Sequence, residues 1–179
     1  MGFVSKLNQA GTALLYSTYL TGTYSDPGDG SQWPQSTEAT SITVDSTGHA
    51  FVAGYTSASD FPVNAGAWQA TQPFPGSLGG FLVKLNRDGS GIAFGTYTPS
   101  PIDALAIDSG GNAYVVGGRE LTKVDSTGTT AVYDYVIGGS GYAPNNEFDV
   151  GLGVAVDAQG NAYVTGDTRS GGGGGYTSG

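Results

Sequence analysis

One unit of sequence occurs three times in this chain, at residues 41–54, 104–117 and 153–166. Each copy alternates apolar and small residues up to an Asp, has a Gly three residues later, and closes with Ala, an aromatic residue, Val, one further residue and Gly. The closing Gly follows the Asp by nine residues in every copy. Two apolar runs joined by a short turn predict a β-hairpin. We therefore expect three equivalent hairpins, named A–B here.

The Asp and the first Gly of each copy have a local role in the turn of the A–B hairpin. An Asp side chain accepts hydrogen bonds from the backbone amides that follow it, and Gly adopts the positive φ that tight turns require. Asp45 and Gly48 hold these positions in the first copy. The turn explains both residues without a ligand.

A second unit also occurs three times and predicts a second hairpin, named C–D here. In each copy a Lys is followed five residues later by Gly, and that Gly is followed five residues later by an aromatic residue. The copies run from Lys6 to Tyr16, from Lys84 to Phe94 and from Lys123 to Tyr133. The constant spacing predicts one shared register for the three C–D hairpins.

The units follow the order C–D, A–B–C–D, A–B–C–D, A–B along the chain. Four antiparallel strands in two hairpins make one blade of a β-propeller. The sequence therefore predicts an all-β fold, a single propeller-type domain over residues 1–179 with three blade equivalents, one of them split between the termini. The expected parts are a half blade at 2–20, blades at 39–97 and 102–137, a half blade at 150–166, and a Gly-rich loop or tail at 167–179.

Three segments carry recognisable signatures: Tyr-Ser-Thr-Tyr-Leu at 16–20, Tyr-Thr-Ser-Ala-Ser-Asp-Phe-Pro at 55–62, and Val-Asp-Ala-Gln-Gly-Asn-Ala-Tyr-Val at 156–164. They resemble the bacterial SBBP-type β-propeller repeat family. The chain departs from the family pattern at His49, where Asn is usual, and in a short connection at 117–121. The resemblance implies a propeller within large exported or surface proteins. It implies no particular reaction and carries over no catalytic residue.

The split blade predicts a mode of assembly. Closed propellers use about four to eight blades, so a ring of three would need steep angles between sheets, and an open arc would leave unpaired strand edges. We expect the last A–B hairpin of one chain to pair with the first C–D hairpin of another. Two chains would close a six-bladed ring, and a rotation that does not close would give a filament. The residues expected to meet are Phe3, Val4 and Leu7 with Tyr163 and Val164. The alternative is an excerpt of a longer surface propeller.

Composition limits the partners. Six Lys and Arg against fifteen Asp and Glu give a formal charge of −9, which disfavours nucleic acid and anionic membranes. No apolar run approaches the ~18 residues of a membrane helix, so we expect no membrane insertion. Few Lys and many Gly, Ser, Thr and Tyr residues are typical of secreted bacterial surface proteins. We therefore expect an extracellular or cell-surface location.

Residues for catalysis are scarce. The chain has no Cys and a single His, His49, which holds the turn position filled by Asn112 and Asn161 in the other copies. Nucleophilic and zinc chemistry therefore lack their usual residue sets. Carboxylates for glycoside hydrolysis are present, but no pattern brings two of them together. We expect no enzyme and no catalytic residue.

Acidic loops are the candidates for a metal. Asp26 and Asp29 lie in one loop and Glu147 and Asp149 in another, and their oxygens are the ligand type that Ca²⁺ prefers. Neither loop has EF-hand spacing, and solvated turns account for both. We therefore expect no required cofactor, with calcium as the metal these loops would take.

Two Trp residues are the candidates for ligand binding. Trp33 and Trp68 lie in the long insertions at 21–38 and 55–80. Aromatic residues on loops stack on sugars or anchor proteins, and they also cap the apolar ends of blades. The main expectation is a non-enzymatic scaffold that associates with itself. The alternative is an adhesion module that binds a glycan or a surface protein.

Overall fold

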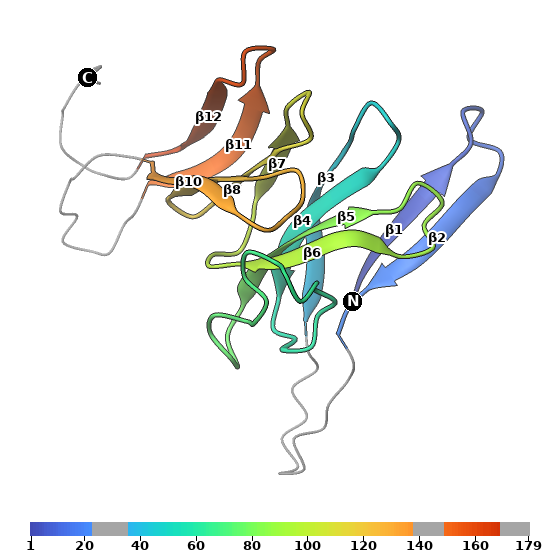
Figure 1. Ribbon diagram of the computed structural model, residues 1–179, viewed down its shortest axis with the longest axis horizontal. Coiled ribbons are helices and arrows are strands. Elements are labelled where there is room, and N and C mark those ends of the chain that lie inside the picture. The colour runs from blue at the N-terminus through green and yellow to red at the C-terminus, as the bar shows by residue number, and fades with distance from the viewer. Residues whose placement is uncertain (23–35, 138–148, 169–179) are drawn as a thin grey trace, which may run out of the picture.

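The computed structural model describes residues 1–22, 36–137 and 149–168, and these residues form twelve β-strands and no helix. The strands make four antiparallel sheets that follow one another along the chain (Figure 1). Two four-stranded sheets lie between two two-stranded ones, which we call the N-terminal and the C-terminal hairpin. The expected all-β antiparallel fold is confirmed. Within the described ranges there is no helix long and apolar enough to cross a membrane.

The strand bounds follow the repeated units. The N-terminal hairpin pairs β1 (Gly2–Leu7) with β2 (Leu14–Leu20). The first four-stranded sheet has the order β3 (Thr37–Val44), β4 (Ala50–Thr56), β5 (Gly79–Leu85), β6 (Ile92–Thr98). The second has the order β7 (Ala104–Ile107), β8 (Ala113–Gly117), β9 (Glu120–Val124), β10 (Ala131–Val136). The C-terminal hairpin pairs β11 (Val150–Val156) with β12 (Ala162–Asp167).

The turns of the A–B hairpins have the chemistry that the sequence predicts. Asp45 Oδ1 accepts hydrogen bonds from the backbone amides of Thr47 and His49, each at 2.9 Å, and Gly48 has a φ of 91°. The other two turns repeat these bonds around their own Asp residues. Because the turn decides where the chain reverses, it also decides which side chains of the next strand face each side of the sheet.

The closing Gly of each A–B unit has a reason that only the fold provides. A Cβ on Gly54 would collide with the backbone carbonyl of Glu38, next to the start of the first strand of the same hairpin. Gly117 and Gly166 meet the corresponding carbonyls of Pro101 and Val150. A strand glycine often marks such a close approach of two backbones. The recurring Gly is therefore a packing requirement.

The sheets pack face to face, with an apolar cluster between each pair of neighbours. The three clusters join the N-terminal hairpin to the first four-stranded sheet, the two four-stranded sheets to each other, and the second of these to the C-terminal hairpin. Strand β7 contacts both β3 and β11, so the first strands of successive sheets lie side by side. The two terminal hairpins lie at opposite ends of the described molecule (Figure 1). Strands near the axis of a propeller are arranged in this way.

Candidate functional site

A cluster of three side chains lies where the two hairpins of the first four-stranded sheet meet. Lys84 Nζ is 3.2 Å from Asp45 Oδ2 and 4.8 Å from the centre of the Phe51 ring. The Phe51 ring is fully buried, and the two charged side chains are largely buried. The ring face attracts the ammonium group and the carboxylate pairs with its charge. We call this arrangement the Asp–aromatic–Lys cluster.

The second four-stranded sheet repeats the cluster. Lys123 Nζ is 3.4 Å from Asp108 Oδ2 and 4.7 Å from the centre of the Tyr114 ring. The Tyr114 hydroxyl is 3.2 Å from Asp108 Oδ2 and 3.1 Å from the backbone carbonyl of Gly160 in the next sheet. The cluster therefore holds the two hairpins of one sheet together and also contacts the neighbouring sheet.

These contacts favour the charged forms of the cluster. Burial alone would raise the pKa of Asp108, but hydrogen bonds from Asn112 and Tyr114 and the charge of Lys123 outweigh it, so this pKa lies below its ordinary value. The pKa of Asp45 is also lowered. The pKa of Lys123 is raised by its contacts with Tyr114 first and with Asp108 second. In the second sheet, both shifts favour the ionised forms of Asp108 and Lys123.

The terminal hairpins carry the parts of the same cluster separately. In the C-terminal hairpin the Tyr163 hydroxyl is 3.1 Å from Asp157 Oδ2. In the N-terminal hairpin Lys6 begins the C–D unit, and its Nζ lies 6.0 Å from the centre of the Tyr16 ring. Among the described residues, neither Lys6 nor Asp157 has an oppositely charged partner within 4.0 Å. One half of the cluster therefore lies at each end of the molecule.

Apolar side chains that are buried in the four-stranded sheets are exposed in the terminal hairpins. Phe3 is 64% exposed, whereas Phe81, at the same position of its C–D unit, is 0% exposed. Tyr163 is 61% exposed, whereas Tyr114, at the same position of its A–B unit, is 0% exposed. Leu7 is 58% exposed. Because these are the same positions of one repeat, the difference in exposure reflects the strands and sheets that surround the four-stranded sheets and that the terminal hairpins lack on one side.

Two other residues expected at the shared blade already pack within their own chain. Val4 is buried against the first four-stranded sheet, and Val164 is half-buried against the second. Side chains alternate between the two faces of a strand, so Phe3 and Leu7 point away from Val4, and Tyr163 points away from Val164. Each terminal hairpin thus has one covered face and one open face.

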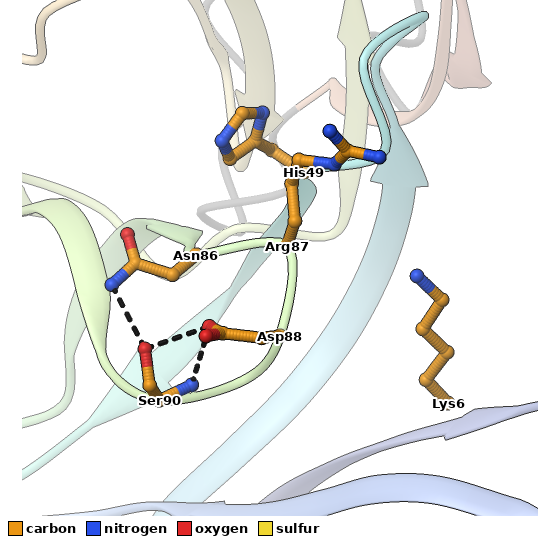
Figure 2. A pocket seen from close by; sticks show the side chains of 6 residues that line it. All are labelled: Lys6, His49, Asn86, Arg87, Asp88 and Ser90. Atoms are coloured by element: carbon orange, nitrogen blue, oxygen red, sulfur yellow. Dashed lines mark hydrogen bonds between the residues drawn. The ribbon is translucent and has the colours of Figure 1, made fainter.

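A shallow cavity of about 520 Å³, wide open to solvent, lies beside Lys6. Figure 2 shows Lys6 on its own strand, apart from the side chains of the neighbouring sheet that complete the lining. Within the β5–β6 turn, Ser90 Oγ donates a hydrogen bond to Asp88 Oδ1 at 2.7 Å, so this carboxylate is engaged by its own turn. The rest of the lining consists of His49, Asn86 and Arg87.

A second cavity, of about 610 Å³, lies at the opposite end of the molecule. It is bounded by the face of β10 and by the turn and β12 of the C-terminal hairpin. Tyr133, Tyr135 and Ile137 give it apolar walls, and Asn161 and Val164 form the other side. Each hollow therefore lies between the covered face of a terminal hairpin, with Lys6 or Val164, and the neighbouring four-stranded sheet.

Of the four calcium candidates, Asp149 lies within the described residues. Asp26, Asp29 and Glu147 lie outside the described residues. Asp149 is buried, and its carboxylate accepts a hydrogen bond from the Thr168 hydroxyl at 2.7 Å. The described ranges contain no group of three His, Cys, Asp or Glu residues that could hold a metal ion. The Asp149 carboxylate thus links the two segments that flank the C-terminal hairpin.

Of the two Trp candidates, Trp33 lies outside the described residues. Trp68 is half-buried against the apolar cluster between the two four-stranded sheets, and its backbone amide donates to the Gly128 carbonyl at 2.9 Å. This is the position of a side chain that covers the core. His49 is a turn residue whose Nδ1 lies 2.8 Å from the Thr47 hydroxyl.

Lys6 and Asp157 are functional candidates that the sequence pattern alone did not single out. In the sequence, the Lys is noticed only for its constant spacing, and the turn by itself explains why an Asp is present. The signal was nevertheless present, because a Lys begins every C–D unit and an Asp precedes every A–B turn. Only the paired strands bring the two recurring charges to one place.

Residues 15–62 match the family model of the SBBP β-propeller repeat. The matched segment starts in β2 of the N-terminal hairpin, runs through β3 and β4 of the next sheet, and ends in the loop after β4. One family repeat thus crosses from one sheet to the next, and the resemblance noted in the sequence is confirmed. A comparison with curated proteins gave no match.

Proposed function

We propose that this chain, with its SBBP β-propeller repeat, is a non-enzymatic structural module outside the cell that associates with itself by completing a propeller blade between two copies. The repeat makes it a scaffold or binding module of the propeller type. Its acidic, Lys-poor composition supports the extracellular location. The contrast in exposure between the terminal hairpins and the equivalent positions of the complete sheets carries the proposal.

Unpaired strand edges supply the backbone part of the interface. The strands of the complete sheets that correspond to β1 and β12 pair on both sides, whereas in the described residues β1 pairs only with β2 and β12 only with β11. An open edge presents N–H and C=O groups that another strand can satisfy. The edges of β1 and β12 are complementary, because one begins a C–D hairpin and the other ends an A–B hairpin.

The register of the shared blade follows from the complete sheets. Val52 pairs with Val83 in the first sheet, and Val115 pairs with Thr122 in the second. The same positions in the terminal hairpins are Val164 and Ser5. Val164 of one copy is therefore expected opposite Ser5 of the other.

The same register accounts for the apolar faces. The open face of the N-terminal hairpin, with Phe3 and Leu7, would pack on the β10 side of the other copy. The open face of the C-terminal hairpin, with Tyr163, would cover β3, where Ile42 is 57% exposed although Leu105, its equivalent in β7, is 8% exposed. Burial of such side chains is the main driving force for association. Two copies joined at both ends make a six-bladed ring, and one junction repeated without closure makes a filament.

Light scattering combined with a cross-link tests the proposal. The chain has no Cys, so a mixture of the S5C and V164C chains under oxidation reports on one pair of positions. We expect wild-type dimers or larger assemblies and a disulfide-linked dimer in this mixture. The S5C and T165C chains form the matched control, because position 165 faces the other side of the strand. A wild-type monomer at all concentrations, or equal cross-linking of both mixtures, contradicts the proposal.

A further inference from the structure

We propose that the cavity beside Lys6 receives the Asp157–Tyr163 pair of a second copy, and that these residues form between chains the Asp–aromatic–Lys cluster that each four-stranded sheet forms within itself. The inference rests on the proposed assembly and assigns its polar contact. It makes Lys6 the residue that recognises the partner copy, and it identifies an acidic turn of this same chain as the group recognised.

Strand pairing places the three residues together. Phe51 pairs with Lys84 across β4 and β5, and Tyr114 pairs with Lys123 across β8 and β9. In both sheets the Lys then lies over the ring and reaches the Asp of the A–B turn. When β12 of one copy pairs with β1 of another in this register, Tyr163 lies opposite Lys6.

The acidic half of the cluster is preformed. Asn161 Nδ2 donates to Asp157 Oδ2 at 2.7 Å, and the Tyr163 hydroxyl is 3.1 Å from the same oxygen. The second four-stranded sheet has nearly the same distances, 2.8 Å from Asn112 and 3.2 Å from Tyr114. Because the carboxylate and the ring are already oriented, little ordering is left for the moment of binding.

The receiving cavity has charge that complements this pair. Lys6 and Arg87 carry positive charge, and the carboxylate of Asp88 is the acidic group in the lining. Asp88 accepts hydrogen bonds from the backbone amide and the hydroxyl of Ser90, at 3.1 Å and 2.7 Å. In a chain whose formal charge is −9, a cavity with more positive than negative groups is a local exception. Opposite charges on two surfaces favour one register of docking.

A second, apolar contact gives the same register independently. The Tyr16 ring covers Gly89 of the next sheet, where a Cβ would lie 2.5 Å from the ring, and Phe94 covers Gly128 in the same way. In each case the aromatic residue of one C–D unit covers the turn Gly of the next unit. Tyr133 is the next aromatic residue in this order, and it would cover the turn Gly of a following C–D unit. Gly11 is the Gly of that turn in the N-terminal hairpin, and nothing lies within 4 Å of where its Cβ would be. Tyr133, 38% exposed, would therefore cover Gly11 of the second copy.

A double-mutant cycle on the full chain tests the cluster. K6M removes the ammonium group. D157N removes the charge but keeps the Oδ1 acceptor that holds the turn amides of Gln159 and Asn161. Sedimentation equilibrium gives the dissociation constant of each variant. An exposed ion pair contributes up to about a 5-fold change per junction, and so about 25-fold in a two-chain ring where it occurs twice. We expect each single variant to raise the dissociation constant by such a factor. The double variant should raise it by no more than one single variant does, because both changes break the same contact.

The R87M variant is the matched control. It removes one positive charge from the same cavity, but its position corresponds to Ser126 in the second sheet, where the backbone amide, and not a charged side chain, bonds Asn112 beside the cluster. We expect its effect to multiply with that of D157N instead of overlapping with it. If D157N does not fold, a K6M and Y163L cycle gives the same information, because the ring is the other partner of the ammonium group.

The outcomes separate the two proposals. Assembly of the wild type with coupling between K6M and D157N supports both. Assembly of the wild type in which K6M and D157N multiply as independent effects leaves the shared blade standing and refutes the cluster. A wild type that stays monomeric refutes both.

Discussion

Replacing Phe3 by Ala should weaken self-association while leaving each monomer folded. Phe3 is 64% exposed, so its truncation removes little packing within the chain, and Phe81 at the equivalent position of a complete blade is 0% exposed. Full burial of a Phe side chain contributes about 1.5–3 kcal/mol, and two thirds of it contributes about 1–2 kcal/mol per junction. A two-chain ring has two such junctions, so its free energy of dissociation should fall by about 2–4 kcal/mol.

These magnitudes also distinguish the two assemblies. A loss of about 2–4 kcal/mol raises the dissociation constant of a ring about 30- to 1,000-fold, whereas one junction of a filament weakens about 5- to 30-fold. Sedimentation equilibrium over a concentration series measures both, and circular dichroism confirms that the monomer keeps its β-structure.

The control is Phe74→Ala, which removes an equally large ring that is 55% exposed and lies in a loop outside both terminal hairpins. We expect no change in its dissociation constant. If Phe3→Ala assembles like the wild type, or if Phe74→Ala is weakened as much, the open face of the N-terminal hairpin is not the interface.

Three further predictions concern the fold. Gly54→Ala should lower the free energy of urea unfolding by about 1–3 kcal/mol, because its Cβ meets backbone; Gly66→Ala, which has open space, should change it by less than about 0.5 kcal/mol. Leu82→Ala should cost about 2–5 kcal/mol, because its side chain is fully buried; an equal loss in Leu78→Ala, which is 47% exposed, would contradict this. The melting temperature should fall as the pH drops below about 4, and less steeply in D108N. The pKa of Asp108 is lower in the folded state than its ordinary 3.8, so its stabilisation is present above that value and is lost as the folded-state carboxyl is protonated. Identical pH profiles for D108N and the wild type would show that Asp108 does not contribute to the fall in melting temperature.

The hairpins and their order were predictable because their determinants are local. An Asp followed three residues later by Gly defines a turn, and alternation of apolar residues defines the faces of the strands on each side of it. The fold in Figure 1 follows that order, with the terminal hairpins at its two ends. Asp45 and Gly48 have in the structure the turn roles that the sequence predicts.

The candidate site was predictable only in part. Phe3, Leu7 and Tyr163, which the sequence places at the expected shared blade, are exposed in the structure. Val4 and Val164 were named for the same interface, yet their side chains are already covered by neighbouring sheets. The alternation along a strand says that two faces differ, but not which of them the neighbouring sheet covers.

By itself, the sequence determined the repeated unit, the place of each turn and the register within each hairpin, because these depend on residues a few positions apart. The tertiary structure decided what the recurring Lys, Asp and closing Gly are for. Lys84 reaches Asp45 across a sequence separation that no local pattern spans, and Gly54 is small because another strand's carbonyl passes beside it. Long-range packing assigns such roles, since it brings together groups that the chain order keeps apart.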